Sequence, residues 1–336
     1  MTTFQDLSIG WSNESTYKTY VAPAIHTEFI DETLDWQKGI VNGKGLRVGS
    51  RVLRSTRRVY HSGMGSGDVS MQIATKGLGK LWGAATGSGT STLVAGSTYQ
   101  QNFVLGDAPN SLTVQKGTVE VGATVDPVSF LGCMVTDFEI ASPNRADVTA
   151  KFTFDIGDYT TAQSYVTPAY PSSVSVFNWG QATVSLGGTL TAPTTTALGS
   201  VAGPTTVGIR SFDVKVKRNL AIDRFNYGAS GRKSKPTVGM TDISGSVVVE
   251  YDGTTIRDAF LGDTDQTLVA TFTGATALST GFEQFQVVLP TVRLEGALPK
   301  SNAGDLIQVT HNFTALDNTT TAQPIWIVQR TADTAL

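Results

Sequence analysis

Apolar and polar residues alternate in several runs of this chain, and this period of two is the feature that most limits its fold. The clearest run covers residues 134–140, and a second covers residues 148–156 after a turn-forming segment. Strict alternation is typical of a strand that turns one face to a core. The first run is therefore predicted to place Met134, Phe138 and Ile140 on one face, and the two runs together are predicted to form an antiparallel hairpin.

The same alternation returns along the rest of the chain. Further strands are predicted around residues 69–73, 212–217, 243–251, 268–272, 285–289, 309–313 and 325–327. Thr, Val, Gly and Ser dominate, which favours half-buried strands joined by glycine turns. Two short helices are expected, one near residues 76–85 and one near 252–262 with its N-cap at Asp252. We therefore predict a mainly β fold, an antiparallel β-sandwich or barrel flanked by one or two short helices.

Length, cysteine content and charge limit the class of protein. The chain has 336 residues and one cysteine, Cys133, so its stability must come from packing and backbone pairing, as suits a reducing cytoplasm. Charged residues make up 16% of the chain, against roughly 25% in an average soluble domain. So sparse a charge suits a protein that is covered by neighbours, and a net charge of -3 argues against a dedicated nucleic-acid binder. Neither a secretion signal nor a membrane span is predicted.

Three segments are predicted to form long loops. Residues 86–96 and 187–208 are rich in Gly, Ser and Thr and are interpreted as exposed insertions with little to bury. Residues 223–239 form a polar loop that is expected to contact a neighbouring subunit. The glycines of segment 63–68 lack the spacing of a phosphate-binding loop, so they are predicted to be turn glycines.

No sequence pattern points to catalysis, a metal or a cofactor. His26, His61 and His311 are far apart and stand in no metal-ligand spacing, and no GxSxG motif is present. We predict a non-enzyme without catalytic, cofactor-binding or metal residues and without a cofactor, and we expect His311 to be a core or interface histidine. Glycosidase chemistry stays open, because its two carboxylates are defined by their separation in space.

Two basic clusters supply the candidate intersubunit contacts. These candidates are Arg47, Arg51, Arg54, Arg57 and Arg58 in the first, acid-free cluster and Arg232, Lys233 and Lys235 in the second. Phosphate binding is one interpretation. Because interleaved aromatic residues and a recognition helix are both missing, a solvated or intersubunit surface is favoured, and the planar fork of arginine suits it for pairing with carboxylates there.

Several segments, taken in chain order, resemble the tail tube proteins, or major tail proteins, of siphophages. They are segments 9–23, 29–32, 44–58, 77–81, 132–138, 209–220, 239–262, 289–296, 313–316 and 324–327. Their force is cumulative, since they cover almost the whole chain. The resemblance implies a structural virion protein of a non-contractile tail, made in the host cytoplasm, whose six-membered rings stack into a hollow tube that conducts the genome into the host.

The resemblance also implies a domain plan and partners. It implies one tail tube domain over residues 1–336, with an N-terminal assembly segment 1–60, a β-sandwich core 61–330 and a C-terminal tail 331–336. The expected partners are further copies of the chain, the tape measure, tail terminator and distal tail proteins, and double-stranded DNA that passes through the lumen without specific binding.

Acidic residues on the polar faces of the strands are candidates for the lumen wall. They are Asp137, Glu139, Asp213 and Glu250. Acids there would weakly repel phosphates. Lys215 and Lys217 complicate this prediction, since either they pair with acids across a subunit boundary or their strand does not line the lumen.

Three other classes stay as alternatives. A β-rich carbohydrate-binding or receptor-binding virion protein would need an exposed aromatic platform, whereas the five tryptophans are scattered in the sequence. A polysaccharide hydrolase would depend on two facing carboxylates. A capsid or connector protein usually carries longer helices.

Overall fold

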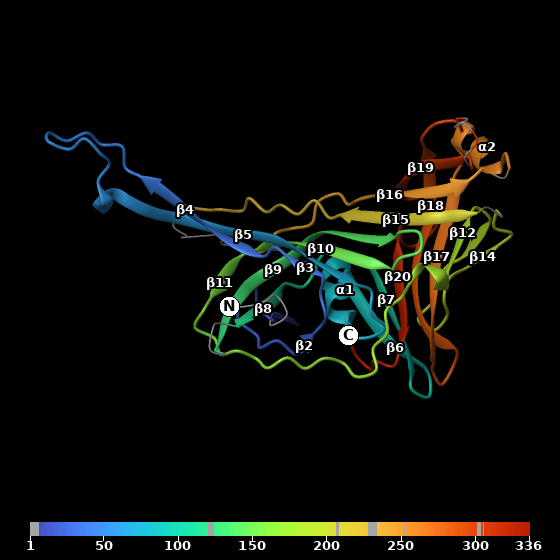
Figure 1. Cartoon of the computed structure of the whole chain (residues 1–336), viewed down its shortest axis with the longest axis horizontal. Coiled ribbons are helices and arrows are strands. Elements are labelled where there is room, and N and C mark those ends of the chain that lie inside the picture. Colours follow the sequence, from blue (N-terminus) through green and yellow to red (C-terminus); the bar gives the residue numbers. More distant parts are fainter. Residues whose placement is uncertain are drawn as a thin grey trace.

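The computed structural model describes residues 7–119, 124–205, 208–227, 234–251, 253–300, 304 and 306–336. It is mainly β and antiparallel, which confirms the predicted fold class. Figure 1 shows a compact body and one projecting arm, which is formed by strands β4 and β5. The first half of the chain contains β1 (Ser8–Asn13), β2 (Ile25–His26), β3 (Asp31–Glu32), β4 (Asp35–Asn42), β5 (Arg58–Gln72), β6 (Gly87–Ala95), β7 (Thr98–Leu105), β8 (Leu112–Val119), β9 (Val125–Ser142), β10 (Thr149–Ile156) and β11 (Asp158–Thr160). The second half contains β12 (Ala182–Leu186), β13 (Thr189–Thr191), β14 (Ser200–Ala202), β15 (Ile209–Lys217), β16 (Asp242–Glu250), β17 (Gln266–Ala277), β18 (Phe282–Glu295), β19 (Gln308–Ala315) and β20 (Trp326–Thr331). The two helices are α1 (Gly79–Thr86) and α2 (Thr255–Leu261).

Two large sheets form the body and share the long strand β18. In the first sheet, strands pair in the order β4-β5-β10-β9-β15-β16-β19-β18. In the second, the order is β12-β17-β18-β20-β7-β6. A smaller group, β2-β1-β8-β9-β11, joins through the first half of β9. Long strands that take part in two sheets therefore hold the layers together.

Helix α1 brings Trp82 into the core between the sheets. The side chain is fully buried, and its ring lies 4.9 Å from Phe152, 5.6 Å from Phe285 and 5.8 Å from Phe138, measured between centroids. These partners lie on β10, β18 and β9. Because aromatic rings bury large areas, this cluster joins helix α1 to strands of both sheets.

The strand predictions are largely confirmed, and one is corrected in detail. The runs at 134–140 and 148–156 pair as the antiparallel hairpin of β9 and β10. A bulge opposite Thr153 and Phe154 shifts the alternation of β9, so Val135 rather than Met134 joins Phe138 in the main core cluster. A bulge adds one residue to one strand and reverses which face the residues before it occupy.

Two predicted loops are instead ordered by pairing and packing. Residues 87–95 form strand β6, which pairs with β7 over its length, so the prediction of an exposed loop at 86–96 is wrong. Segment 187–208 contains the hairpin of β13 and β14, and its Leu190, Leu198 and Val201 pack on a small apolar cluster on the second sheet. Small β-forming residues were enough for both structures, because neighbouring strands supply the buried contacts.

The glycines of segment 63–68 lie within β5, so the prediction of turn glycines is also wrong. A Cβ at Gly63 would meet the Trp36 ring at 2.3 Å, and one at Gly67 would meet the backbone of Leu34 at 2.5 Å. Trp36 in turn packs on Tyr159, with ring centroids 5.2 Å apart. Glycine is needed here because the chain before and at the start of β4 lies directly on β5.

The first described strand, β1, lies in the body. Ile9 and Trp11 of β1 are buried, and the Glu14 carboxylate accepts hydrogen bonds from Ser111, Thr113 and the backbone N–H groups of residues 18 and 132. At the other end, Asp333 accepts from the backbone N–H of residue 77. Both terminal segments therefore contact the core.

Helix α2 closes the end of the body far from the arm. Ile256 and Ala259 are buried, and the Phe260 ring lies 5.7 Å from the ring of His311, which is buried as expected. The residue before the helix is Thr254, and the predicted N-cap Asp252 lies outside the described residues.

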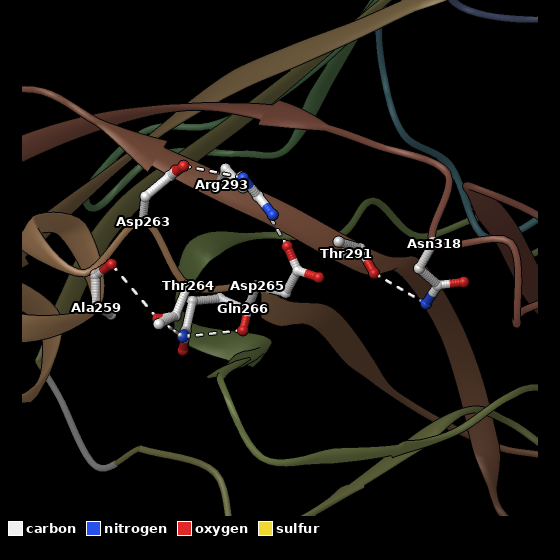
Figure 2. A network of polar contacts seen from close by, with 8 residues as sticks. All are labelled: Ala259, Asp263, Thr264, Asp265, Gln266, Thr291, Arg293 and Asn318. Carbon is white, nitrogen blue, oxygen red and sulfur yellow. Dashed lines mark hydrogen bonds and ion pairs between the residues drawn. The ribbon is translucent and has the colours of Figure 1, made fainter.

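An arginine ties the turn after α2 to β18. Figure 2 shows Arg293 between two aspartates: its Nη1 donates to Asp263 and its Nε to Asp265, each at 2.9 Å. Close by, Asn318 donates to Thr291 at 3.0 Å. The side chains of Arg293, Asp263 and Asp265 are 42%, 67% and 53% exposed, so these ion pairs fix the turn rather than the core.

A second arginine, Arg218, is buried and caps helix α1. Its guanidinium donates from Nη1 to the carbonyl oxygens of Ala85 and Thr86 and from Nη2 to that of Gly106. The last carbonyl groups of a helix have no partner within the helix, so this side chain satisfies two of them. Arg218 follows β15, and it therefore connects the first sheet to the helix in the core.

Replacing Arg218 by methionine is expected to lower the free energy of unfolding by about 2–4 kcal/mol, because three carbonyl oxygens lose the guanidinium as a donor while the volume is roughly kept. Urea unfolding of the monomer, followed by tryptophan fluorescence, measures the change. The exposed Arg293→Met is the matched control and should shift the midpoint much less. Equal effects of the two substitutions would contradict the capping role.

Gly67→Ala is expected to push the chain at residues 33–34 away from β5 and loosen β4, since the nearest backbone atoms are only 2.5 Å from the new Cβ. Hydrogen exchange of the β4 amides should become faster while that of β9 stays unchanged. Gly83→Ala in α1 is the control, because its Cβ meets no atom within 4 Å. Alanine there should be neutral or should stabilise the helix by up to about 1 kcal/mol.

Candidate assembly surfaces

The arm is a two-stranded ribbon that extends strand β5 beyond the body. We use the term arm for residues 35–64. Strand β10 pairs with β5 only as far as Gly65, whereas β4 continues to pair with it as far as Arg58. From Gly65 outward, no third strand of the described part of the chain pairs with the ribbon, and Figure 1 shows the ribbon projecting past the body. A two-stranded ribbon alone is at best marginally stable in water.

The outer part of the arm is apolar and basic at once. Its exposed apolar residues are Val41, Leu46, Val48, Val52, Leu53, Val59 and Tyr60. Leu46 and Val48 are 100% and 99% exposed. No acid occurs between Asp35 and Asp68. A monomer gains nothing from such a surface, so the arm has the properties of a contact element.

The first basic cluster lies on this arm, in or next to the segment 43–57 that joins its strands. Arg47, Arg51, Arg57 and Arg58 are exposed and Arg54 is half-buried. Among the described residues none of the five makes an ion pair. The apolar residues between them were a signal that the sequence interpretation did not use.

Of the second basic cluster, only Lys235 lies within the described residues. Lys235 is half-buried in the connection between β15 and β16, and burial lowers the pKa of its ammonium group. Arg224 donates to its carbonyl oxygen at 2.6 Å. Arg232 and Lys233 lie outside the described residues. Intersubunit contact through this cluster stays a prediction.

Three of the four candidate lumen acids lie on one polar face of the first sheet. Asp137 and Glu139 come from β9 and Asp213 from the adjacent β15, where Phe138, Ile140, Phe212 and Val214 beside them are buried. In register, Glu139 stands opposite Lys215 and Asp137 opposite Lys217. Cross-strand neighbours of opposite charge stabilise a sheet, so the lysines balance these acids within the chain.

The charge alternation continues across this face to β10 and β5. Glu139 also stands opposite Lys151 of β10, and Lys151 forms an ion pair with Asp68 at 2.8 Å. Partial burial is the largest single influence on the pKa of Asp68 and acts to raise it, but hydrogen bonds from Lys151 and Thr153 and the charges of Lys151 and Lys215 together lower the pKa below its usual value. The fourth acid, Glu250, lies at the end of β16 and pairs with Arg210 at 2.9 Å. We use the term polar face for the surface formed by Asp68, Asp137, Glu139, Lys151, Asp213, Lys215 and Lys217.

The remaining candidates for chemistry are structural. Cys133 is buried, and its burial raises the pKa of the thiol well above the usual value. His26 packs against Gly10, and burial lowers its pKa. Exposed His61 bonds to Ser62 at 2.8 Å. Across the described ranges, no group of three or more His, Cys, Asp or Glu side chains is placed to hold a metal ion.

The five tryptophans all fall within the described residues and form no platform. Trp11, Trp82 and Trp326 are buried, and Trp36 and Trp179 are half-buried. Trp179 also donates from Nε1 to the carbonyl oxygen of Arg210 at 2.8 Å. Their placement gives no support to a sugar-binding surface built on tryptophan.

Of the helices that the structure describes, none is long and apolar enough to cross a membrane.

Comparison with family models shows which proteins the chain is similar to. No curated protein matches the chain at a significant level. The family model for phage tail tube proteins matches residues 5–315, which includes the arm, the strands of the polar face and helix α2. The chain therefore belongs to the phage tail tube protein family.

Proposed function

We propose that the chain is the repeating subunit of the tube in a non-contractile phage tail, that six copies close into a ring, and that stacked rings form the channel through which the genome passes. Membership of the tail tube family makes it a structural component of the virion tail that assembles into a tube. The ring number and the conducted genome are our proposals, as is the absence of catalysis.

The arm is the observation that carries this proposal. It exposes two unpaired strand edges, a run of apolar side chains and unpaired arginines, all beyond the body. Unpaired edges and apolar patches are liabilities for a monomer and become contacts in an assembly. We therefore propose the arm, together with residues of the predicted 1–60 segment that flank it, as an assembly element.

The polar face is proposed as the wall of the lumen. Its acids alternate with lysines, so that positive charges capable of holding phosphates are each next to a carboxylate. Binding to DNA rises with the number of phosphates that free cations neutralise. A surface of balanced charge would let double-stranded DNA pass without holding it. The tape measure, tail terminator and distal tail proteins are proposed as partners at the tube ends and in the lumen.

Electron microscopy of the purified chain at rising concentration tests the proposal. Six-fold rings or hollow tubes are expected, with light scattering that rises above a threshold concentration. A map of the tube should place Asp137 and Lys217 on the inner wall. A protein that stays monodisperse and monomeric at every concentration would contradict the proposal, and a map with the polar face outside would contradict the assignment of the lumen.

We call residues 43–57 the arm tip. Removing it is expected to block assembly while the monomer still folds. Replacing residues 43–57 by an Asn-Gly turn is expected to keep the thermal unfolding midpoint of the monomer within a few degrees, because no residue of that segment is buried. An Asn-Gly pair suits a two-residue hairpin turn. The same variant should form no tubes at concentrations where the unmodified chain does. Normal tubes from it would show that the arm tip is dispensable.

A further inference from the structure

A groove in the body has the size and charge to receive an arm tip. Its inner part is a hollow of about 140 Å³ lined by Phe29, Leu78, Val176 and other residues of segments 27–30, 72–78 and 170–176. Ligand pockets are usually about 300–1,000 Å³, so this hollow is too small for a typical ligand but large enough for an aliphatic side chain. A second hollow, lined by residues 28–32, continues it and shares Tyr170.

The edge of the groove is apolar and exposed. Ile30 is 60% exposed although its backbone N–H is fixed to the carbonyl oxygen of Ser70 at 2.8 Å. Tyr170 and Val174 are also exposed at the opposite side. Inside, the hydroxyl of Thr27 is buried and has no partner among the described residues. These residues leave an apolar surface in water and one polar atom unsatisfied.

Charge on the groove is complementary to the arm. Glu32 is paired with Lys116, and the ammonium of Lys76 is held by two loop carbonyls, whereas Glu28 and Asp31 are exposed and make no ion pair within the described residues. The carbonyl groups leave the charge of Lys76 in place, but Glu28 and Asp31 together exceed it, so the groove carries a net negative charge. The arm tip, in contrast, carries three arginines among apolar residues and no acid over segment 46–54.

We propose that the arm tip of one copy of the chain docks into this groove on a second copy, with an aliphatic side chain of segment 46–53 in the hollow and its arginines beside Glu28 and Asp31. This inference rests on the proposed self-assembly. Within one chain the contact cannot form, since eight residues of ribbon carry the tip roughly 25 Å from the body and Figure 1 shows it pointing away. Because arm and groove are different surfaces, the contact is heterologous, as repeated assembly of rings or stacks requires.

Charge reversal tests the pairing. Glu28→Arg with Asp31→Arg on one chain, or Arg51→Glu with Arg54→Glu on another, should each raise the concentration required for assembly about tenfold or more, the effect of roughly 1.4 kcal/mol of lost contact. A mixture of the two variants should recover much of the assembly, because the reversed arm then meets the reversed groove. Exposed Asp126→Arg is the control and should assemble normally.

Disulfide trapping locates the contact directly. Chains carrying Ile30→Cys are mixed with chains carrying Leu46→Cys or Leu53→Cys, and the buried Cys133 does not interfere. Crosslinked dimers are expected in the mixture under mild oxidation. The control places the groove cysteine at Leu261, which is 59% exposed on α2 at the far end of the body, and should give no dimer.

The outcomes separate this inference from the proposed function. Tubes that assemble normally with the reversed groove, or crosslinks to Leu261→Cys instead of Ile30→Cys, would overturn the docking proposal and leave the tube subunit standing. A wild-type chain that never assembles would overturn the proposed function, and the absence of arm-to-groove disulfides in the same protein would then overturn the docking proposal as well.

Discussion

Strand β5 is the element that joins the body to the arm. It pairs with β10 in the body and with β4 in the arm, so the position of the arm depends on this strand. Its C-terminal half pairs with β10 and buries Val69 and Met71, while its N-terminal half pairs only with β4 in solvent. A strand held at one end by a core is stiff enough to project the other end, which a free loop of the same length would not be. Gly63, Gly65 and Gly67 make this possible, because they let Trp36 and the chain before it lie directly on the strand.

The interior shows how a largely antiparallel chain with few helices secures its layers. Trp82 of α1 packs on aromatic rings from both sheets, and Arg218 binds the carbonyl groups at the end of the same helix. One helix of eight residues is thus fixed by an apolar and a polar contact. The polar face of the first sheet is stabilised in another way, because acids and lysines stand opposite each other on neighbouring strands and balance their charges. The body is stable and its polar face is balanced in charge, whereas the arm exposes apolar side chains and strand edges. Such a subunit is suited to assembly with further copies of itself.

Periodicity in the sequence predicted the strands and helices well. The hairpin of β9 and β10, the strands from β15 to β20 and both helices lie where the pattern placed them. The errors have physical causes. At Met134 a bulge reversed the alternation, and at segment 86–96 pairing with β7 ordered residues whose composition suits a loop. Glycine at Gly65 signals a turn or a close approach equally well, and only the position of Trp36 distinguishes them.

By itself the sequence determined the β class, the polar and apolar faces and the family resemblance, since these depend on residue types at short spacing. It also indicated the arginines of the first cluster as candidate intersubunit contacts and the acids Asp137 and Glu139 as candidates for the lumen wall. The tertiary structure decided which of them share a surface. It put the arginines on a projecting ribbon and set the acids opposite Lys217 and Lys215, because the register between strands distant in the sequence is fixed by long-range pairing and core packing that no local pattern contains.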